Sequence, residues 1–136
     1  MEAKEFRNEE KYILNLLYIF GEVDGRTKMQ KLFYLLRHKY KKIIPFEYSR
    51  HFYGPFSSSL HETILSLVRK NLIEERSFLN VGYSYSLTNL GKASVFLGLV
   101  NLPSNVIEIL KILNEEYSKK SREEIVSEVY QIAGIK

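Results

Sequence analysis

Hydrophobic side chains recur every three to four residues in six segments of the chain, which is the spacing of a helix with one buried face. The predicted helices span residues 8 to 20, 27 to 40, 57 or 59 to 71, 88 to 97, 104 to 117 and 121 to 134. Three of their starts have the Ser/Thr-x-x-Glu/Gln spacing of a capping box: Thr27 with Gln30, Ser59 with Glu62, and Ser121 with Glu124. Ser57 is an alternative cap for the third helix, and Thr88 caps the fourth.

Strands are expected where polar and apolar residues alternate. Residues 46 to 53, "FEYSRHFY", fit one short strand that ends at a Gly54-Pro55 turn. Residues 72 to 76 and 83 to 87 fit a β-hairpin with Asn80 and Gly82 in its loop. The order helix, helix, strand, helix, hairpin, helix predicts an α+β, mostly helical protein of the winged helix-turn-helix class. We expect one domain over residues 1 to 136, with a core of about 8 to 100 and a C-terminal two-helix extension.

Composition excludes several classes of protein. With 136 residues, 45% of them hydrophobic and 26% charged, the chain is expected to fold as one globular domain. No apolar run reaches the length of about 18 residues that a membrane span needs, and the start has no signal-peptide pattern. The chain has no cysteine. These features favour a cytoplasmic protein without a membrane partner.

Catalytic and metal-binding patterns are missing from the sequence. Three histidines, His38, His51 and His61, lie in separate predicted elements without metal-ligand spacing, and Asp24 is the only aspartate. No glycine-rich phosphate-binding motif occurs. We therefore expect no enzymatic activity, no metal and no cofactor.

Positive charge is concentrated in one segment of the chain. Residues 26 to 50 contain eight lysines and arginines against one acid, whereas the whole chain carries a net charge of +4. On a helical wheel of the second predicted helix, the lysines lie on an arc away from the apolar face: Lys28, Lys31, Lys39 and Lys42. Such a stripe is either a binding surface for an anionic polymer or a solvated helix face.

The stretch "FYGPFSSSL", residues 52 to 60, leads into the third helix. Its serines can cap the helix, and together with the free amides of the first turn they can also bind a phosphate oxygen. The outward face of this helix lacks an early Arg or Asn for bidentate base contacts, and the hairpin tip, residues 78 to 81, has no basic residue.

Several stretches resemble a known group of proteins: "GRTKMQKLFYLL", "FEYSRHFYGPFSSSL", "LVRKNLIEE" and "YSYSLTNLGK". They are similar to small prokaryotic winged-helix proteins of the transcriptional-regulator type and, more distantly, to the Panacea domain of antitoxins. The resemblance covers about residues 9 to 98. It implies a winged helix that binds either DNA or another protein.

The leading hypothesis is a homodimeric transcriptional regulator that binds double-stranded DNA. Its predicted DNA-binding residues are Arg26, Lys28, Lys31, Ser57, Ser58, Ser59, Thr63, Ser66 and Arg69. Lys39 and Lys42 would extend the phosphate-binding stripe, and residues 104 to 134 would form the dimer interface. The alternative is a protein-interaction module of the antitoxin or adaptor type, with the apolar hairpin tip as its contact surface.

Overall fold

The structure is a computed structural model that describes residues 5–42, 44–51, 54–79 and 82–134. The helices in these ranges are α1 (Asn8–Phe20), α2 (Arg26–His38), α3 (Ser58–Arg69), α4 (Asn89–Phe96), α5 (Ser104–Tyr117) and α6 (Arg122–Ala133). The strands are β1 (Glu22–Asp24), β2 (Ser49–His51), β3 (Gly54–Phe56), β4 (Ile73–Phe78) and β5 (Gly82–Leu87). The predicted α+β, mostly helical class is confirmed at this level.

Helices α1 and α2 form the centre of the molecule. Helix α1 contacts α3, α4 and α5, and α2 contacts β3, α3, α5 and α6. More of each helix is therefore buried than the one apolar face that a helical wheel predicts. Leu14 of α1 and Leu35 of α2 lie outside those faces and are fully buried. Because neighbours cover α2 on several sides, its polar side chains also lie under other elements.

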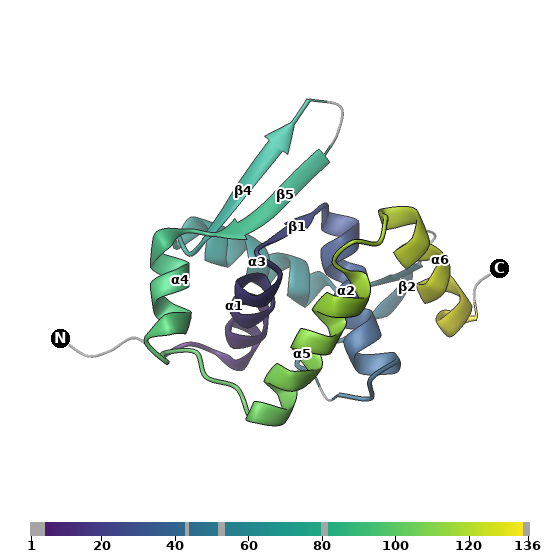
Figure 1. Cartoon of the computed structure of the whole chain (residues 1–136). Coiled ribbons are helices and arrows are strands. Elements are labelled where there is room, and N and C mark those ends of the chain that lie inside the picture. The colour runs from purple at the N-terminus through teal and green to yellow at the C-terminus, as the bar shows by residue number, and fades with distance from the viewer. Residues whose placement is uncertain (1–4, 43, 52–53, 80–81, 135–136) are drawn as a thin grey trace.

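The largest sheet is antiparallel, with the strand order β1-β5-β4. Its hairpin pairs Ile73 with Leu87 at the base and Phe78 with Gly82 at the tip, so the predicted β-hairpin is present. Gly82 was expected in the loop but lies in β5, and Asn80 lies outside the described residues. Strand β1 continues the sheet by pairing Val23 with Tyr85. The hairpin projects away from the helices (Figure 1).

The segment before α3 differs from the prediction. Gly54 and Pro55 were expected to form a turn, but they lie in β3, which pairs with β2 through Ser49–Phe56 and Arg50–Pro55. The predicted single strand is thus a two-stranded hairpin. Phe52 and Tyr53 lie outside the described residues.

Two helix starts were assigned incorrectly. Helix α2 has Gly25 as its N-cap without a side-chain hydrogen bond, so the predicted Thr27–Gln30 capping box does not form. Instead, the Gln30 side chain donates to the Ser57 carbonyl oxygen and accepts from the Ser57 amide, both at 2.8 Å. Helix α3 is capped by Ser57, the alternative considered, and not by Ser59. These bonds fix the first turns of α2 beside the start of α3.

The C-terminal helices belong to the core of the same chain. Their apolar faces are buried: Val106, Leu110, Leu113 and Tyr117 in α5, and Ile125 and Val129 in α6. Both helices pack against α2. The expectation that these faces form a dimer interface therefore loses its basis, because the chain itself covers them.

Candidate nucleic-acid interface

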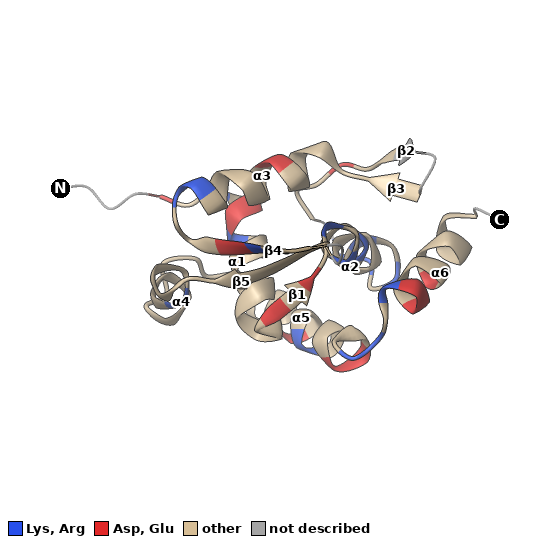
Figure 2. Ribbon diagram, turned by 90° about the horizontal axis from the view of Figure 1, so that it is seen from above, with Lys and Arg blue, Asp and Glu red and all other residues tan. Residues whose placement is uncertain are grey.

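Helix α3 lies along one side of the molecule, opposite α5 (Figure 2). Its outer surface contains Ser58, Ser59, Glu62 and Arg69, all exposed, with Ser66 partly exposed. Serine hydroxyls can bond several bases or a phosphate oxygen, whereas Glu62 accepts only from donors such as the cytosine amine. This surface matches the predicted recognition surface in four of its residues: Ser58, Ser59, Ser66 and Arg69.

Two predicted contact residues of this region are buried. Ser57 is 0% exposed, and its Oγ accepts from the Leu60 amide at 3.2 Å. Thr63 is 5% exposed, and its hydroxyl donates to the Ser59 carbonyl oxygen at 2.7 Å. Both hydroxyls serve the helix itself, so the prediction that Ser57 and Thr63 face a ligand is wrong. Ser57 acts as a cap, which was one of the two roles considered for the serines.

Lys31 was predicted on the phosphate-binding stripe, but it is only 4% exposed. Its ammonium donates to the Pro55 carbonyl oxygen at 2.8 Å, and burial lowers its pKa. The helical wheel was right that Lys31 lies away from the apolar arc of α2. It could not show that β3 and α6 cover that side of the helix.

Arg26 is exposed but held by neighbours from the sheet. Its guanidinium lies 3.8 Å from the centre of the Tyr83 ring, and Nε donates to the Tyr85 hydroxyl at 3.3 Å. The Glu75 carboxylate lies 3.9 Å from Arg26 and accepts from Tyr85 at 2.7 Å. Burial, supported by the bond to Glu75, raises the pKa of Tyr85 to about 12. Glu75 therefore offsets part of the Arg26 charge.

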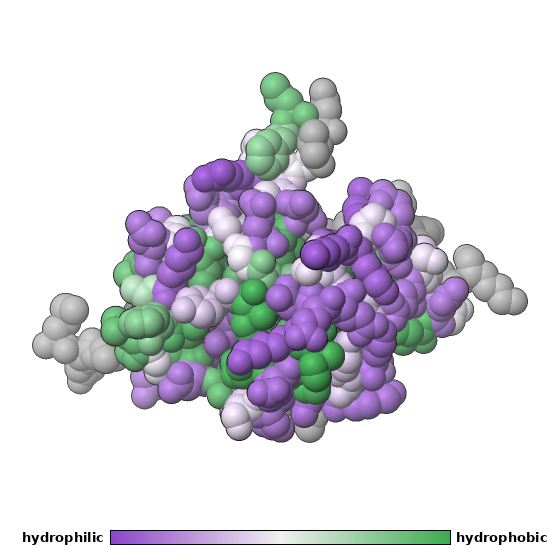
Figure 3. Space-filling view, in the orientation of Figure 1, coloured by the Kyte–Doolittle hydropathy of each residue, from purple (hydrophilic) through white to green (hydrophobic). Residues whose placement is uncertain are grey.

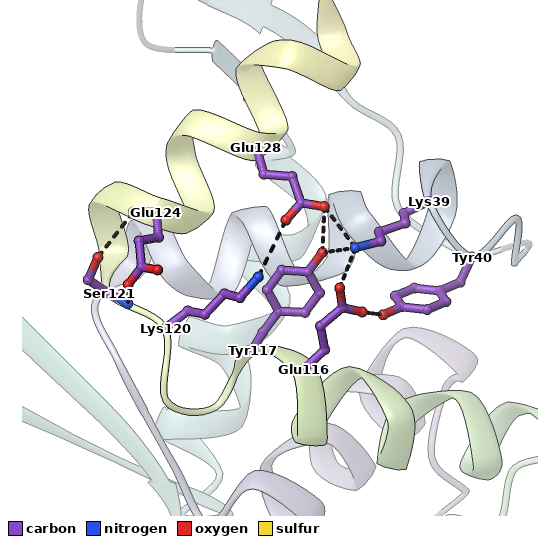
Figure 4. A network of polar contacts seen from close by, with 8 residues as sticks. All are labelled: Lys39, Tyr40, Glu116, Tyr117, Lys120, Ser121, Glu124 and Glu128. Carbon is purple, nitrogen blue, oxygen red and sulfur yellow. Dashed lines mark hydrogen bonds and ion pairs between the residues drawn. The ribbon is translucent and has the colours of Figure 1, made fainter.

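Lys39 is neutralised by the C-terminal helices (Figure 4). Its ammonium forms ion pairs with Glu116 of α5 and with Glu128 of α6, the latter at 2.8 Å. It also bonds the Tyr117 hydroxyl, which in turn donates to Glu128 at 2.7 Å. Burial alone would lower the pKa of Lys39, but these hydrogen bonds outweigh it and raise the pKa. Lys39 is thus a structural residue rather than a phosphate contact.

The cations that remain free are fewer than the stripe suggested. Lys28 and Arg69 make no hydrogen bond or ion pair with the described part of the chain. Lys28 lies two residues before Gln30, whose bonds to Ser57 place the start of α2 beside Ser58 and Ser59. On α3 itself, Ser58 and Ser59 lie at the first turn, and Arg69 is the last residue. Lys42 lies elsewhere, beside Arg37 and Ile44 at a small depression.

A pocket next to this surface was missed in the sequence. It has a volume of about 620 Å³ and lies between the start of α2, β3, α3 and α6. Helix α6 contributes Arg122, Val126 and Tyr130 to its wall. No local pattern could identify these residues, because they reach the pocket only through the packing of α6 on α2.

The most exposed large hydrophobic side chains lie at two places. At the hairpin tip, Phe78 is 50% exposed and Leu79 is 94% exposed. At the end of α4 and just beyond it, exposed fractions are 79% for Phe96, 68% for Leu97 and 53% for Leu99. Figure 3 shows hydrophobic residues at the hairpin tip and over α4. Contiguous exposed apolar surface of this kind is typical of protein contacts.

Within the described ranges, no group of His, Cys, Asp or Glu side chains could hold a metal ion. No helix there is long and apolar enough to cross a membrane.

Comparison with known proteins finds a similar protein over part of the chain. The chain is 38% identical over 78 residues to an uncharacterized protein, YwgA, of Bacillus subtilis (strain 168). The match covers 54% of this chain and 45% of the Bacillus protein, so the chain spans about half the length of that relative. No family model and no solved structure matches the chain.

Proposed function

We propose that this chain is a non-enzymatic winged helix-turn-helix protein that binds double-stranded DNA and acts as a cytoplasmic transcriptional regulator. The order of α1, β1, α2, α3, β4 and β5, with a projecting β4–β5 hairpin, supports this proposal. In that architecture α3 enters the major groove and the hairpin is the wing.

The observation that carries the proposal is the surface formed by α3 and the start of α2. The bonds between Gln30 and Ser57 bring the start of α2, which contains Lys28, to the start of α3, and neither Lys28 nor Arg69 makes a hydrogen bond or ion pair within the described residues. Lys28 and Arg69 would bind phosphates, and the serines would bind phosphate or base edges. Because this surface has no early Arg or Asn, we expect binding to depend on phosphate contacts more than on base readout.

A charge reversal of Lys28 tests the proposal. Lys28→Glu should weaken binding to any duplex by about tenfold or more, because it replaces an attraction to phosphate with a repulsion. The matched control is Lys119→Glu, which makes the same charge change at an exposed lysine that has no partner in the described chain and lies outside α3 and α2. Fluorescence anisotropy with a labelled duplex at low salt measures both. Equal losses in the two variants would show that only net charge matters and would remove the proposed surface.

The apolar hairpin tip favours a second candidate, a protein-interaction module. Leu79 is almost fully exposed beside Phe78, and no basic residue accompanies them in the described part of the tip. A wing that binds the minor groove would be expected to carry Arg or Lys. Leu79→Ser separates the two functions: it should leave duplex affinity unchanged and abolish a partner contact at the tip. Failure to detect duplex binding at low salt would make this candidate the leading one.

A further inference from the structure

We propose that the pocket between α2, β3, α3 and α6 binds a small organic anion, in which a carboxylate or phosphate group is attached to an apolar body. This proposal is independent of duplex binding, because Lys28 and Arg69 do not line the pocket. The argument rests on its size, its charge and its apolar wall.

The pocket is large enough for a small molecule. Its volume of about 620 Å³ lies within the range of about 300 to 1,000 Å³ that is typical of ligand sites. Residues of α2, of the β3–α3 segment and of α6 form it, so the site exists only in the folded chain.

The charge of the pocket is positive. Arg26, Lys31 and Arg122 line it together with His61, and none of the described lining residues is acidic. Arg122 makes no ion pair or hydrogen bond with the described part of the chain. Its guanidinium can therefore bind a carboxylate or phosphate in a bidentate manner.

Lys31 is the strongest indication of an anion. It is 4% exposed and bonds the neutral Pro55 carbonyl, yet no described carboxylate pairs with it. An ammonium buried without a counter-charge is unfavourable, and its lowered pKa reflects that cost. The Pro55 carbonyl uses one of the three donors of the ammonium. A bound anion would accept from another donor and supply the missing charge.

Part of the pocket wall is apolar or aromatic and suits an apolar body. Phe56 and Val126 line it with the ring of Tyr130. Gly54 lets this ring approach: a Cβ at position 54 would lie 2.6 Å from Tyr130 Cε1 and 3.4 Å from Lys31 Nζ. Gly54 also has a φ of +99°, a backbone conformation that residues other than glycine rarely adopt. The tyrosine ring and the buried ammonium therefore meet at the same backbone position.

The start of α2 adds a third feature. Thr27 lines the pocket, and the N-cap residue, Gly25, has no side chain to bond the first amides of the helix. Amides at a helix start favour a bound anion, although they would not define a site alone.

Binding of defined probes tests the proposal. Phenyl phosphate and benzoate should bind, and titrations followed by ¹⁵N-edited NMR should shift the amides of residues 26 to 31 and 122 to 130. Neutral benzamide, which has nearly the same shape as benzoate, should bind at least about tenfold more weakly because it lacks the charge. Inorganic phosphate should also bind more weakly than phenyl phosphate, because it has no apolar body. Equal affinity for benzoate and benzamide, or no binding of either anion at millimolar concentrations, would overturn the proposal.

Variants assign the binding to the pocket. Arg122→Gln should weaken benzoate binding about tenfold, whereas Lys119→Gln, an equivalent loss of charge outside the pocket, should not change it. Lys31→Met, which keeps the length of the side chain, should have an effect like that of Arg122→Gln. If Lys31→Met does not fold, Arg122→Gln alone decides, because Arg122 is exposed. Duplex affinity should be equal in Arg122→Gln and the wild type. Loss of duplex binding with unchanged benzoate binding would assign Arg122 to DNA and reject the anion site.

Discussion

At the scale of single residues, Lys39 joins α2 to both C-terminal helices. Burial alone would raise the pKa values of Glu116 and Glu128, but hydrogen bonds from Lys39 outweigh it and lower both. Tyr40 donates to the other oxygen of Glu116, and Lys120 lies 4.0 Å from Glu128. The side chains of Lys39, Glu116 and Glu128 remain between a quarter and about a third exposed. Solvent therefore screens this network in part, and its contribution to stability is moderate.

Lys39→Met should lower the free energy of unfolding by about 1–2 kcal/mol, because it leaves two neighbouring carboxylates without their cation. Lys119→Met is the control and should change stability by less than about 0.5 kcal/mol. Urea unfolding followed by circular dichroism measures both. Equal stabilities for wild type and Lys39→Met at pH 7 would contradict the assigned role.

The pH dependence of this difference has a defined sign. A carboxylate whose pKa is lowered on folding stabilises the fold above its ordinary pKa of about 4.5, and that stabilisation is lost as the pH falls through the lowered value. The pKa of Lys39 is raised on folding. The contribution of its charge to stability is therefore present below about pH 10.5 and is lost as the pH rises through the pKa of the folded state. The difference in the free energy of unfolding between the wild type and Lys39→Met should thus be constant between about pH 5 and pH 10 and become smaller in acid.

At the scale of elements, α5 and α6 complete the core. Leu110, Leu113, Tyr117, Ile125 and Val129 are each 0% exposed. Removal of these helices would expose the faces of α1 and α2 that they cover. The C-terminal segment is therefore part of the folding unit and not an appendage to it.

A chain that ends at Leu102 should lose its cooperative thermal transition, because burial of about five large side chains contributes roughly 1.5–3 kcal/mol each. That sum is comparable with the whole stability of a domain of this size, about 5–15 kcal/mol. Circular dichroism melting of the truncated and full-length proteins measures the effect. A truncated chain with a sharp transition near that of the full-length protein would show that the core is complete without α5 and α6.

Features that depend on residues close together in the sequence, such as helix caps, were the most predictable. Thr88 and Ser121 cap α4 and α6 as expected, because each bonds an amide three residues away. Gln30 failed as a capping residue because the Ser57 backbone, 27 residues away, takes both ends of its amide group. Lys31 and Lys39 failed as phosphate contacts for the same reason. A helical wheel gives the direction of a side chain but not the element that packs against it.

At the scale of the whole molecule, exposed hydrophobic surface is concentrated beyond the core helices. Three side chains at the end of α4 and just beyond it are more exposed than any large hydrophobic side chain on α5 or α6 in the described chain: Phe96, Leu97 and Leu99. Contiguous exposed apolar residues of this kind favour a protein contact. We therefore propose that the chain forms a homodimer through the end of α4 and not through residues 104 to 134.

Phe96→Ser should convert a dimer to a monomer, because it replaces the most exposed aromatic ring of this surface with a polar group. Ile132→Ser makes a comparable change on α6, where 39% of Ile132 is exposed, and should leave the dimer intact. Sedimentation velocity of both variants at micromolar concentrations distinguishes the two surfaces. Dissociation by Ile132→Ser alone would restore α6 as the interface, and a monomeric wild type would reject the dimer.

The salt dependence of duplex binding tests the central claim most directly. Lys28 and Arg69 give two free cations per subunit at the proposed surface and four in a dimer. Each phosphate contact contributes about 0.9 to the slope, so log affinity against log salt should fall with a slope of about −4. A duplex of mixed sequence, titrated at several salt concentrations, provides this slope. A linear decrease of this size is the predicted result. No binding at low salt, or an affinity that salt does not change, would contradict the assignment of α3 and Lys28 as a DNA-binding surface.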